Sequence, residues 1–203
     1  MNKPERSLSR GRPREFCVEE ALSKALRLFW SKGYDGTSIS DLTEAMGITR
    51  PSLYAAFGNK ESLFRKALDL YESEKKAYVG KALTQPSARA VAETLLRGAV
   101  ANSTACGEPH GCLGVITSVA CGNEAEAVRA EVVERSHVVR KALVDRFAQA
   151  KQSGDLPEHT DVEGLTSLLY ALMMGISVQA GAGATRADLD RLVDTGLAMW
   201  PSV

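Results

Sequence analysis

Apolar residues recur along most of the chain at the spacing of one face of an α-helix. The first such face predicts a helix over residues 18–32 and comprises Leu22, Ala25, Leu26, Phe29 and Trp30. Gly33 and Gly36 end this helix. We find no stretch in which apolar and polar residues alternate as in a β-strand, so the fold class that we expect is all-α, with about nine helices.

Two short helices separated by a tight turn are predicted next, over residues 38–46 and 50–57. Thr37 or Ser38 can cap the first of them. Gly47 can adopt the left-handed backbone conformation that the turn requires. These proportions are typical of a helix-turn-helix, in which the first helix braces a second one that enters the major groove of DNA.

The second short helix has the surface chemistry of a DNA-recognition helix. Thr49 can cap it, and Pro51 falls in its first turn, where the missing N–H costs little. Its outward residues are Thr49, Arg50, Ser52, Tyr54 and Ala55. Hydroxyl groups and an arginine can reach base edges or phosphates, and small side chains allow a close approach.

The rest of the chain also has helical periodicity. Four further helices begin at the capping residues Asn59, Ser87, Asn123 and Thr185; a short apolar helix covers residues 113–120, and an apolar stripe marks residues 165–176. Loops rich in Gly, Pro or Ala separate these segments.

The first 16 residues contain prolines, a glycine and many charges but no apolar period, so we expect a basic flexible arm there. Residues 1–66 hold 12 of the 25 basic side chains and 8 of the 25 acidic ones, an excess of four positive charges in a chain that is neutral overall. A positive arm attracts phosphates. A solvated basic tail explains the same charge pattern.

Composition favours a soluble protein: 44% of the residues are hydrophobic and 25% are charged. The longest apolar-rich stretch, residues 165–178, is shorter than the ~20 residues that cross a membrane, and the N-terminus has no apolar segment. We therefore expect a cytoplasmic protein without a membrane partner. Four cysteines are too few for a disulfide scaffold, and we expect them to be thiols.

Three segments resemble the N-terminal domain of the TetR family of transcriptional regulators. They read WSKGYDGTSI at residues 30–39, AMGI at 45–48 and LYAAFGNKESLF at 53–64. The match is continuous over residues 18–65, and GRPR at residues 11–14 is similar to the arm of one branch of the family. The resemblance implies an arm over residues 1–16, a DNA-binding domain over 17–66 and a helical ligand-binding and dimerisation domain over 67–203.

The resemblance also implies roles for single residues. Arg50, Pro51, Ser52 and Tyr54 would contact DNA, with Thr49 capping their helix. Thr37, Ser38 and Lys60 would meet the phosphate backbone, and Arg12 and Arg14 would enter a minor groove. The protein would be a ligand-responsive regulator, a repressor by default, and would need no cofactor.

One recognition helix reads too few base pairs to find a site in a genome. A two-fold homodimer places two such helices roughly 34–36 Å apart on a near-palindromic operator of double-stranded DNA. The candidate interface residues are Leu165, Leu169, Leu172, Leu189, Leu192, Val193 and Trp200. Core packing within one subunit is the alternative for all of them.

A pocket for a small-molecule effector is implied between the helices of the C-terminal part. Its candidate lining residues are Asn102, Cys112, Ile116, His137, Tyr170 and Met173, with Leu95, Val133 and Met174 beside them. An apolar set with a few polar groups is typical of a ligand pocket, and equally of an ordinary core.

The cysteines leave alternatives open. Cys106, His110, Cys112 and Cys121 have the chemistry to bind zinc or Cu(I), although their spacing is not that of a tight motif, so we assign no metal ligand. Cys112 can instead be a reactive thiol or an inert one. An enzyme using Cys112 with His110 or His137 lacks an acid partner at a recognisable spacing. A helical adaptor with a vestigial helix-turn-helix would bind DNA with little sequence preference.

Overall fold

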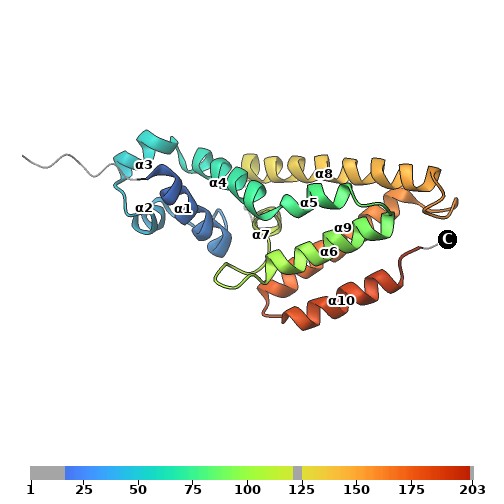
Figure 1. Ribbon diagram of the computed structural model, residues 1–203. Coiled ribbons are helices and arrows are strands. Elements are labelled where there is room, and N and C mark those ends of the chain that lie inside the picture. Colours follow the sequence, from blue (N-terminus) through green and yellow to red (C-terminus); the bar gives the residue numbers. More distant parts are fainter. Residues whose placement is uncertain (1–16, 121–124, 202–203) are drawn as a thin grey trace, which may run out of the picture.

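The computed structural model describes residues 17–120 and 125–201, and these residues form ten α-helices and no strand (Figure 1). The helices are α1 Val18–Lys32, α2 Ile39–Met46, α3 Arg50–Phe57, α4 Lys60–Lys75, α5 Ala77–Leu83, α6 Ala88–Ser103, α7 Leu113–Ala120, α8 Glu126–Gln152, α9 Val162–Gly181 and α10 Arg186–Ala198. The all-α prediction is confirmed. The tenth helix arises because the chain breaks at Lys76 (φ −106°, ψ 12°), which separates α5 from α4.

Capping residues set most helix starts where the sequence predicted them. The Ser38 side chain accepts a hydrogen bond from the Asp41 N–H, and the Asp41 carboxylate accepts one from the Ser38 N–H, which makes a complete capping box on α2. Asn59, Ser87 and Thr185 cap α4, α6 and α10 through the same kind of side-chain acceptor. The predicted cap Asn123 lies outside the described residues, and α8 begins at Glu126.

Two hydrophobic clusters form the interior. The first, which we call the N-terminal cluster, is built from α1 to α4 together with Leu113 of α7 and Val128 and Val132 of α8. The second joins α5, α6, α9, α10 and the later part of α8. Figure 1 shows α1 to α3 gathered at one end, with α4 leading from them toward the other helices. The boundary predicted between residues 66 and 67 falls inside α4, so this domain division stays a prediction.

Aromatic contacts hold α1 against α4. The ring centroids of Phe29 and Phe64 are 5.1 Å apart, and those of Trp30 and Tyr71 are 4.9 Å apart, both in edge-to-face geometry. All four side chains are buried. The short helices α2 and α3 therefore rest on a rigid base.

The loop before α7 ties α1 to the second cluster. Trp30 Nε1 donates a hydrogen bond of 3.2 Å to the buried carbonyl of Gly111. Gly111 has φ +87°, and a Cβ added there would lie 3.0 Å from the carbonyl oxygen of Ser177 on α9. Only glycine fits this backbone between α1 and α9.

Helix α9 is longer than the apolar stretch that the sequence indicated. Its 20 residues have the length and composition of a membrane-spanning helix, and 33% of its apolar stretch is buried in the protomer. The helix packs against α6, α8 and α10. One such helix is also what the interior of a soluble protein contains.

Candidate nucleic-acid interface and ligand cavity

The outward face of α3 is open to solvent. Leu53 and Phe57 bury its inner face, whereas Arg50, Pro51 and Tyr54 are exposed, Tyr54 to 50%. The Arg50 guanidinium donates a hydrogen bond of 2.7 Å to Ser40 Oγ on α2. This bond holds the arginine over the surface shared by the two helices, and sequence reasoning had given Ser40 no role.

Hydroxyl groups mark the start of each helix in this pair. Thr49 Oγ1 accepts a hydrogen bond of 3.3 Å from the Ser52 N–H and lies 2.9 Å from Ser52 Oγ, which confirms Thr49 as the cap of α3. Ser38 is exposed at the start of α2. Hydrogen bonds from the Ser38 side chain, the Ser38 N–H and Lys32 hold the pKa of Asp41 well below its ordinary value. The Asp41 carboxylate of this capping box is therefore ionised at neutral pH.

The Thr37 side chain does not reach the surface at which the predicted phosphate contact would be made. Thr37 is fully buried, and its hydroxyl donates a hydrogen bond of 2.7 Å to the Gly33 carbonyl at the end of α1. The neighbouring Ser38 takes the capping position, which turns Thr37 inward.

Lys60 lies at the start of α4, close to the helix-turn-helix. Its Nζ is 4.2 Å from the centroid of the Tyr34 ring, within the range of a cation–π contact. Arg12 and Arg14, the predicted minor-groove residues, lie outside the described residues.

A cavity of about 320 Å³ lies among helices α5 to α9, with Lys76 between α4 and α5 at its wall. Five of the six predicted pocket residues line it, namely Asn102, Cys112, His137, Tyr170 and Met173, and so do Val133 and Met174. Ile116 does not line it: its Cγ2 lies beside Gly33 of α1, against the N-terminal cluster. Leu95 belongs to the core of the second cluster.

Neutral hydrogen-bonding groups surround this cavity. Asn102 Nδ2 donates to the Tyr71 hydroxyl at 2.8 Å, and the Tyr170 hydroxyl donates to the Ser136 carbonyl at 3.0 Å. Burial raises the pKa of Tyr71 and of Tyr78, and raises that of Tyr170 to about 12. All three phenols are therefore uncharged at neutral pH.

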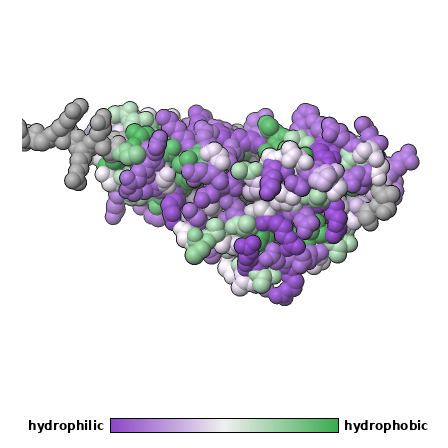
Figure 2. Space-filling view, in the orientation of Figure 1, coloured by the Kyte–Doolittle hydropathy of each residue, from purple (hydrophilic) through white to green (hydrophobic). Residues whose placement is uncertain are grey.

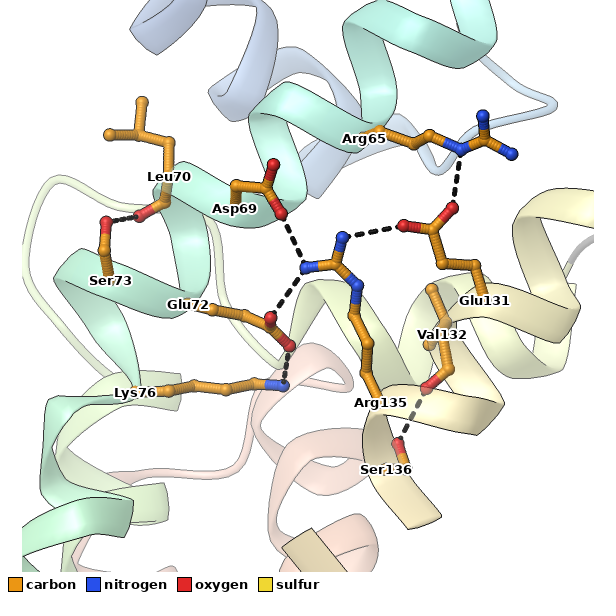
Figure 3. A network of polar contacts seen from close by, with 10 residues as sticks. All are labelled: Arg65, Asp69, Leu70, Glu72, Ser73, Lys76, Glu131, Val132, Arg135 and Ser136. Atoms are coloured by element: carbon orange, nitrogen blue, oxygen red, sulfur yellow. Dashed lines mark hydrogen bonds and ion pairs between the residues drawn. The ribbon is translucent and has the colours of Figure 1, made fainter. Parts of the chain in front are cut away.

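Three cations that sequence reasoning missed also line the cavity: Lys76, Arg135 and Arg140. Arg135 is the centre of an ion network between α4 and α8 (Figure 3). Its guanidinium donates to Asp69 at 2.7 Å and to Glu72 at 2.8 Å on α4, and to Glu131 at 2.7 Å on its own helix. Lys76 Nζ lies 3.2 Å from the other oxygen of Glu72.

The network favours the charged forms of Arg135 and Glu131. Partial burial lowers the pKa of Arg135, but hydrogen bonds to Glu131, Glu72 and Asp69 outweigh it, and the net shift is upward. Burial likewise opposes ionisation of Glu131, whereas hydrogen bonds from Arg135 and Arg65 bring its pKa below the ordinary value. The network therefore fastens α4 to α8 with ionised groups at neutral pH.

The described cysteines are not arranged as a metal site. Cys17 and Cys106 are exposed, Cys112 is half-buried in the cavity wall, and Cys121 lies outside the described residues. Among the residues that the structure describes, no three His, Cys, Asp or Glu side chains come together as metal ligands. Thiol chemistry at Cys112 stays a hypothesis.

Five of the seven predicted interface residues pack inside their own protomer. Leu165, Leu169, Leu189, Val193 and Trp200 are at most 9% exposed and belong to the second cluster. They have almost no surface to offer a partner, so their assignment to the interface is corrected to core packing. Leu172 and Leu192 are half-buried and lie beside the exposed Met199 at a shallow depression of α9 and α10.

The face in Figure 2 is mostly hydrophilic, with apolar residues in small separate groups.

A capped, exposed helix over a rigid base, joined to a helical part with a cavity, defines a regulator that combines DNA reading and ligand sensing in one chain. Residues 21–67 match the family model described as "Bacterial regulatory proteins, tetR family", and residues 89–195 match the "Tetracyclin repressor-like, C-terminal domain". The chain belongs to the TetR family and is a DNA-binding transcriptional regulator.

Relatives of known role agree with this assignment. The chain is 34% identical over 199 residues to the HTH-type transcriptional repressor ComR of Escherichia coli, covering 96% of this chain and 94% of that protein. It is 30% identical over 173 residues to the repressor BdcR of the same organism, covering 85% and 83%. A cysteine mutant of the regulator CifR, solved with a 26-bp operator, is 40% identical and superposes with a TM-score of 0.87 over 94% of this chain and 100% of that one.

Proposed function

We propose that the chain is a repressor that binds a near-palindromic operator as a homodimer and that a small molecule in the cavity controls this binding. The observation that carries the proposal is the exposed face of α3, where Arg50 and Tyr54 stand on a braced and capped helix. Full-length similarity to two curated repressors, and to a regulator solved on operator DNA, supports it.

The proposed DNA contacts follow from the side chains available on α3. An arginine such as Arg50 can donate two hydrogen bonds to guanine O6 and N7 in the major groove. Tyr54 and Ser52 offer hydroxyls to base edges or phosphates, and Pro51 adds apolar contact. Ser38 and Lys60 flank this helix and are placed to meet the phosphate backbone.

The proposed dimer interface is the outer face of α9 and α10. Only 33% of the apolar stretch of α9 is buried within the protomer. Leu168, Val178 and Met199 are exposed to 49%, 57% and 68%, and Leu172 and Leu192 are half-buried. Met199 lies with these two leucines at the depression of α9 and α10. A second copy would cover these apolar side chains by the two-fold packing that spaces two α3 helices on DNA.

The test is a selection of fragmented genomic DNA from the source organism by the purified protein, followed by sequencing. We expect a few fragments that share a near-palindrome. Arg50→Ala and Tyr54→Ala should each weaken binding to that fragment about 30-fold or more, because each removes one contact of at least about 1 kcal/mol from both half-sites.

Lys141→Ala is the control, because Lys141 is exposed on α8 and, among the described residues, its ion pair is with Asp145. It removes one positive charge, as Arg50→Ala does, far along the chain from α3. We expect it to leave operator affinity within about twofold. Uniform retention of all fragments, or equal effects of Arg50→Ala and Lys141→Ala, would contradict sequence-specific binding through α3.

A further inference from the structure

The charged side chains that line the cavity, among the residues that the structure describes, are cations. Lys76, Arg135 and Arg140 contribute to its wall, and no aspartate or glutamate of residues 17–120 or 125–201 does. The remaining wall is largely apolar and includes Val79, Val115, Val139 and Met173. Such a cavity favours a ligand with a negative head and an apolar body.

Two of these cations already hold a carboxylate between them. Glu72 Oε2 lies 2.8 Å from Arg135 Nη1, and Glu72 Oε1 lies 3.2 Å from Lys76 Nζ (Figure 3). Glu72 comes from α4 and does not line the cavity, whereas both of its partners do. The geometry for a carboxylate that bridges Lys76 and Arg135 is therefore present, and the same two cations are within reach of a ligand.

We propose that the cavity binds an amphipathic organic anion whose carboxylate bridges Lys76 and Arg135 in competition with Glu72. Its apolar body lies against Val79, Val115, Val139 and Met173. At about 320 Å³ the cavity is near the lower end of the usual range for ligand sites, about 300–1,000 Å³, so the ligand is small.

This ligand class also supplies a switch, and here the inference rests on the proposed function. Arg135 of α8 holds Glu72 of α4, and Lys76, which directly follows α4, pairs with the same carboxylate. Helix α4 itself follows the recognition helix α3 after Gly58 and Asn59. An anion that draws the two cations into the cavity weakens this attachment. A neutral ligand of the same shape fills the cavity without loosening α4.

The first experiment measures binding of two acid–amide pairs by isothermal titration calorimetry at pH 7.5: octanoate with octanamide, and 4-phenylbutanoate with 4-phenylbutanamide. We expect at least one acid to bind about tenfold or more tightly than its amide, the effect of one charge-assisted contact. If no acid binds, or if each acid and its amide bind equally, the proposal is overturned.

Variants then locate the head group. Lys76→Gln and Arg135→Gln should each remove most of the difference between acid and amide. Arg129→Gln should preserve it, because Arg129 lies on the same helix and pairs with Glu126 but does not line the cavity. If Arg135→Gln fails to fold by circular dichroism, Lys76→Gln decides, since the Lys76 side chain makes one ion pair only among the described residues. Unchanged discrimination in Lys76→Gln overturns the assignment.

Glu72→Gln gives the sharpest result, because it is expected to improve binding. Removing the internal competitor frees Lys76 and Arg135, so the acid should bind several-fold more tightly to this variant than to the wild type. A general loss of structure would weaken binding instead. A lower affinity for the acid in a folded Glu72→Gln variant would overturn the competition with Glu72.

The last experiment separates the two proposals. The acid, but not its amide, should release the selected operator fragment in a fluorescence anisotropy titration. If no fragment is selected, the proposed function fails while the acid–amide difference still stands by itself. If a fragment is selected but acid and amide act alike on it, the anion switch fails alone.

Discussion

Replacing each of the two tryptophans by phenylalanine offers a test of how α1 is tied to the rest of the protein. Trp30 is 1% exposed and donates its indole N–H to the Gly111 carbonyl at 3.2 Å. Trp200 is 6% exposed and packs on Phe147, but its Nε1 has no hydrogen-bond partner among the described residues. The two substitutions remove the same atoms, but only the Trp30 site has a hydrogen bond from the indole N–H to lose.

The expected magnitudes follow from that difference. Complete loss of a buried Trp side chain costs about 3–5 kcal/mol, and phenylalanine retains the larger part, so packing loss is about 1–2 kcal/mol at either site. At Trp30 the lost hydrogen bond leaves a buried carbonyl unpaired, which adds about 1–3 kcal/mol. At Trp200 the substitution removes an unpaired buried N–H, which offsets the packing loss by a similar amount. Trp30→Phe should therefore be at least about 2 kcal/mol more destabilising than Trp200→Phe.

Urea unfolding followed by circular dichroism at 222 nm measures both variants. Tryptophan fluorescence does not serve, because the chain has only these two tryptophans. The protein concentration is held constant, since dimer formation contributes to apparent stability, and equal slopes of free energy against urea show that the same unfolding is compared. Equal destabilisation by the two variants, or a larger loss for Trp200→Phe, would refute the role of the Trp30–Gly111 bond.

Two further predictions concern the cavity wall and the ion network. A Cβ added at Gly98 would come within 3.0 Å of three ring carbons of Tyr78, which lines the cavity. Overpacking there costs about 1–3 kcal/mol, which outweighs the gain in helix propensity of ~1 kcal/mol, so Gly98→Ala should lower the melting temperature. Gly80 has open space around it, so Gly80→Ala should raise the melting temperature. Folding lowers the pKa of Glu131, so its carboxylate stabilises the fold above its unfolded pKa of about 4.3 and this contribution is lost as the pH falls through the lower folded value. Glu131→Gln should thus lose less stability than the wild type in urea unfolding between about pH 6 and pH 3, and an equal loss would contradict this assignment.

Local signals explain why the helix order could be predicted from the sequence. Ser38, Thr49, Asn59 and Thr185 each place a side-chain acceptor at the start of an apolar period, and each caps a helix. The break at Lys76 carries no such signal, because neither glycine nor proline occurs between residues 59 and 79. It depends on how α4 and α5 pack against different clusters, which is a tertiary effect.

The direction in which each side chain points was harder to predict than the helices that carry them. The apolar period of α9 is broad, and it does not say whether Leu168 or Leu169 faces the protomer's own core; the structure buries Leu169 and exposes Leu168. The same holds for Thr37, since two adjacent residues could cap α2 and only one of them does. Five cavity residues were predicted because the family resemblance implied a pocket between the helices of the C-terminal part, and the structure places them there.

The cations of the cavity could not be recognised in the sequence for a related reason. Arg135 stands on a helix with many charges and has no distinguishing neighbours along the chain. Its role becomes apparent only from its ion pairs with Asp69 and Glu72, which lie on α4, far from Arg135 in the sequence. From the sequence alone, a charged residue is interpreted as a solvated surface residue, because its partners in the fold are not known.

Two routes join the cavity to the DNA-binding end, and they differ in what can act on them. Helix α7 presents Gly114 and Val115 to the cavity and Leu113 to the N-terminal cluster, so it contacts both. The ion network responds only to charge. A ligand shifts the balance between DNA-competent and incompetent states only through its different affinity for the two. From Lys60 to Glu72, α4 extends about 18 Å as one helix, so Glu72 and the end beside α3 belong to one continuous element. Because Lys76 and Arg135 bind either Glu72 or the proposed anion, the network gives an anion the difference in affinity that a neutral molecule of the same shape lacks.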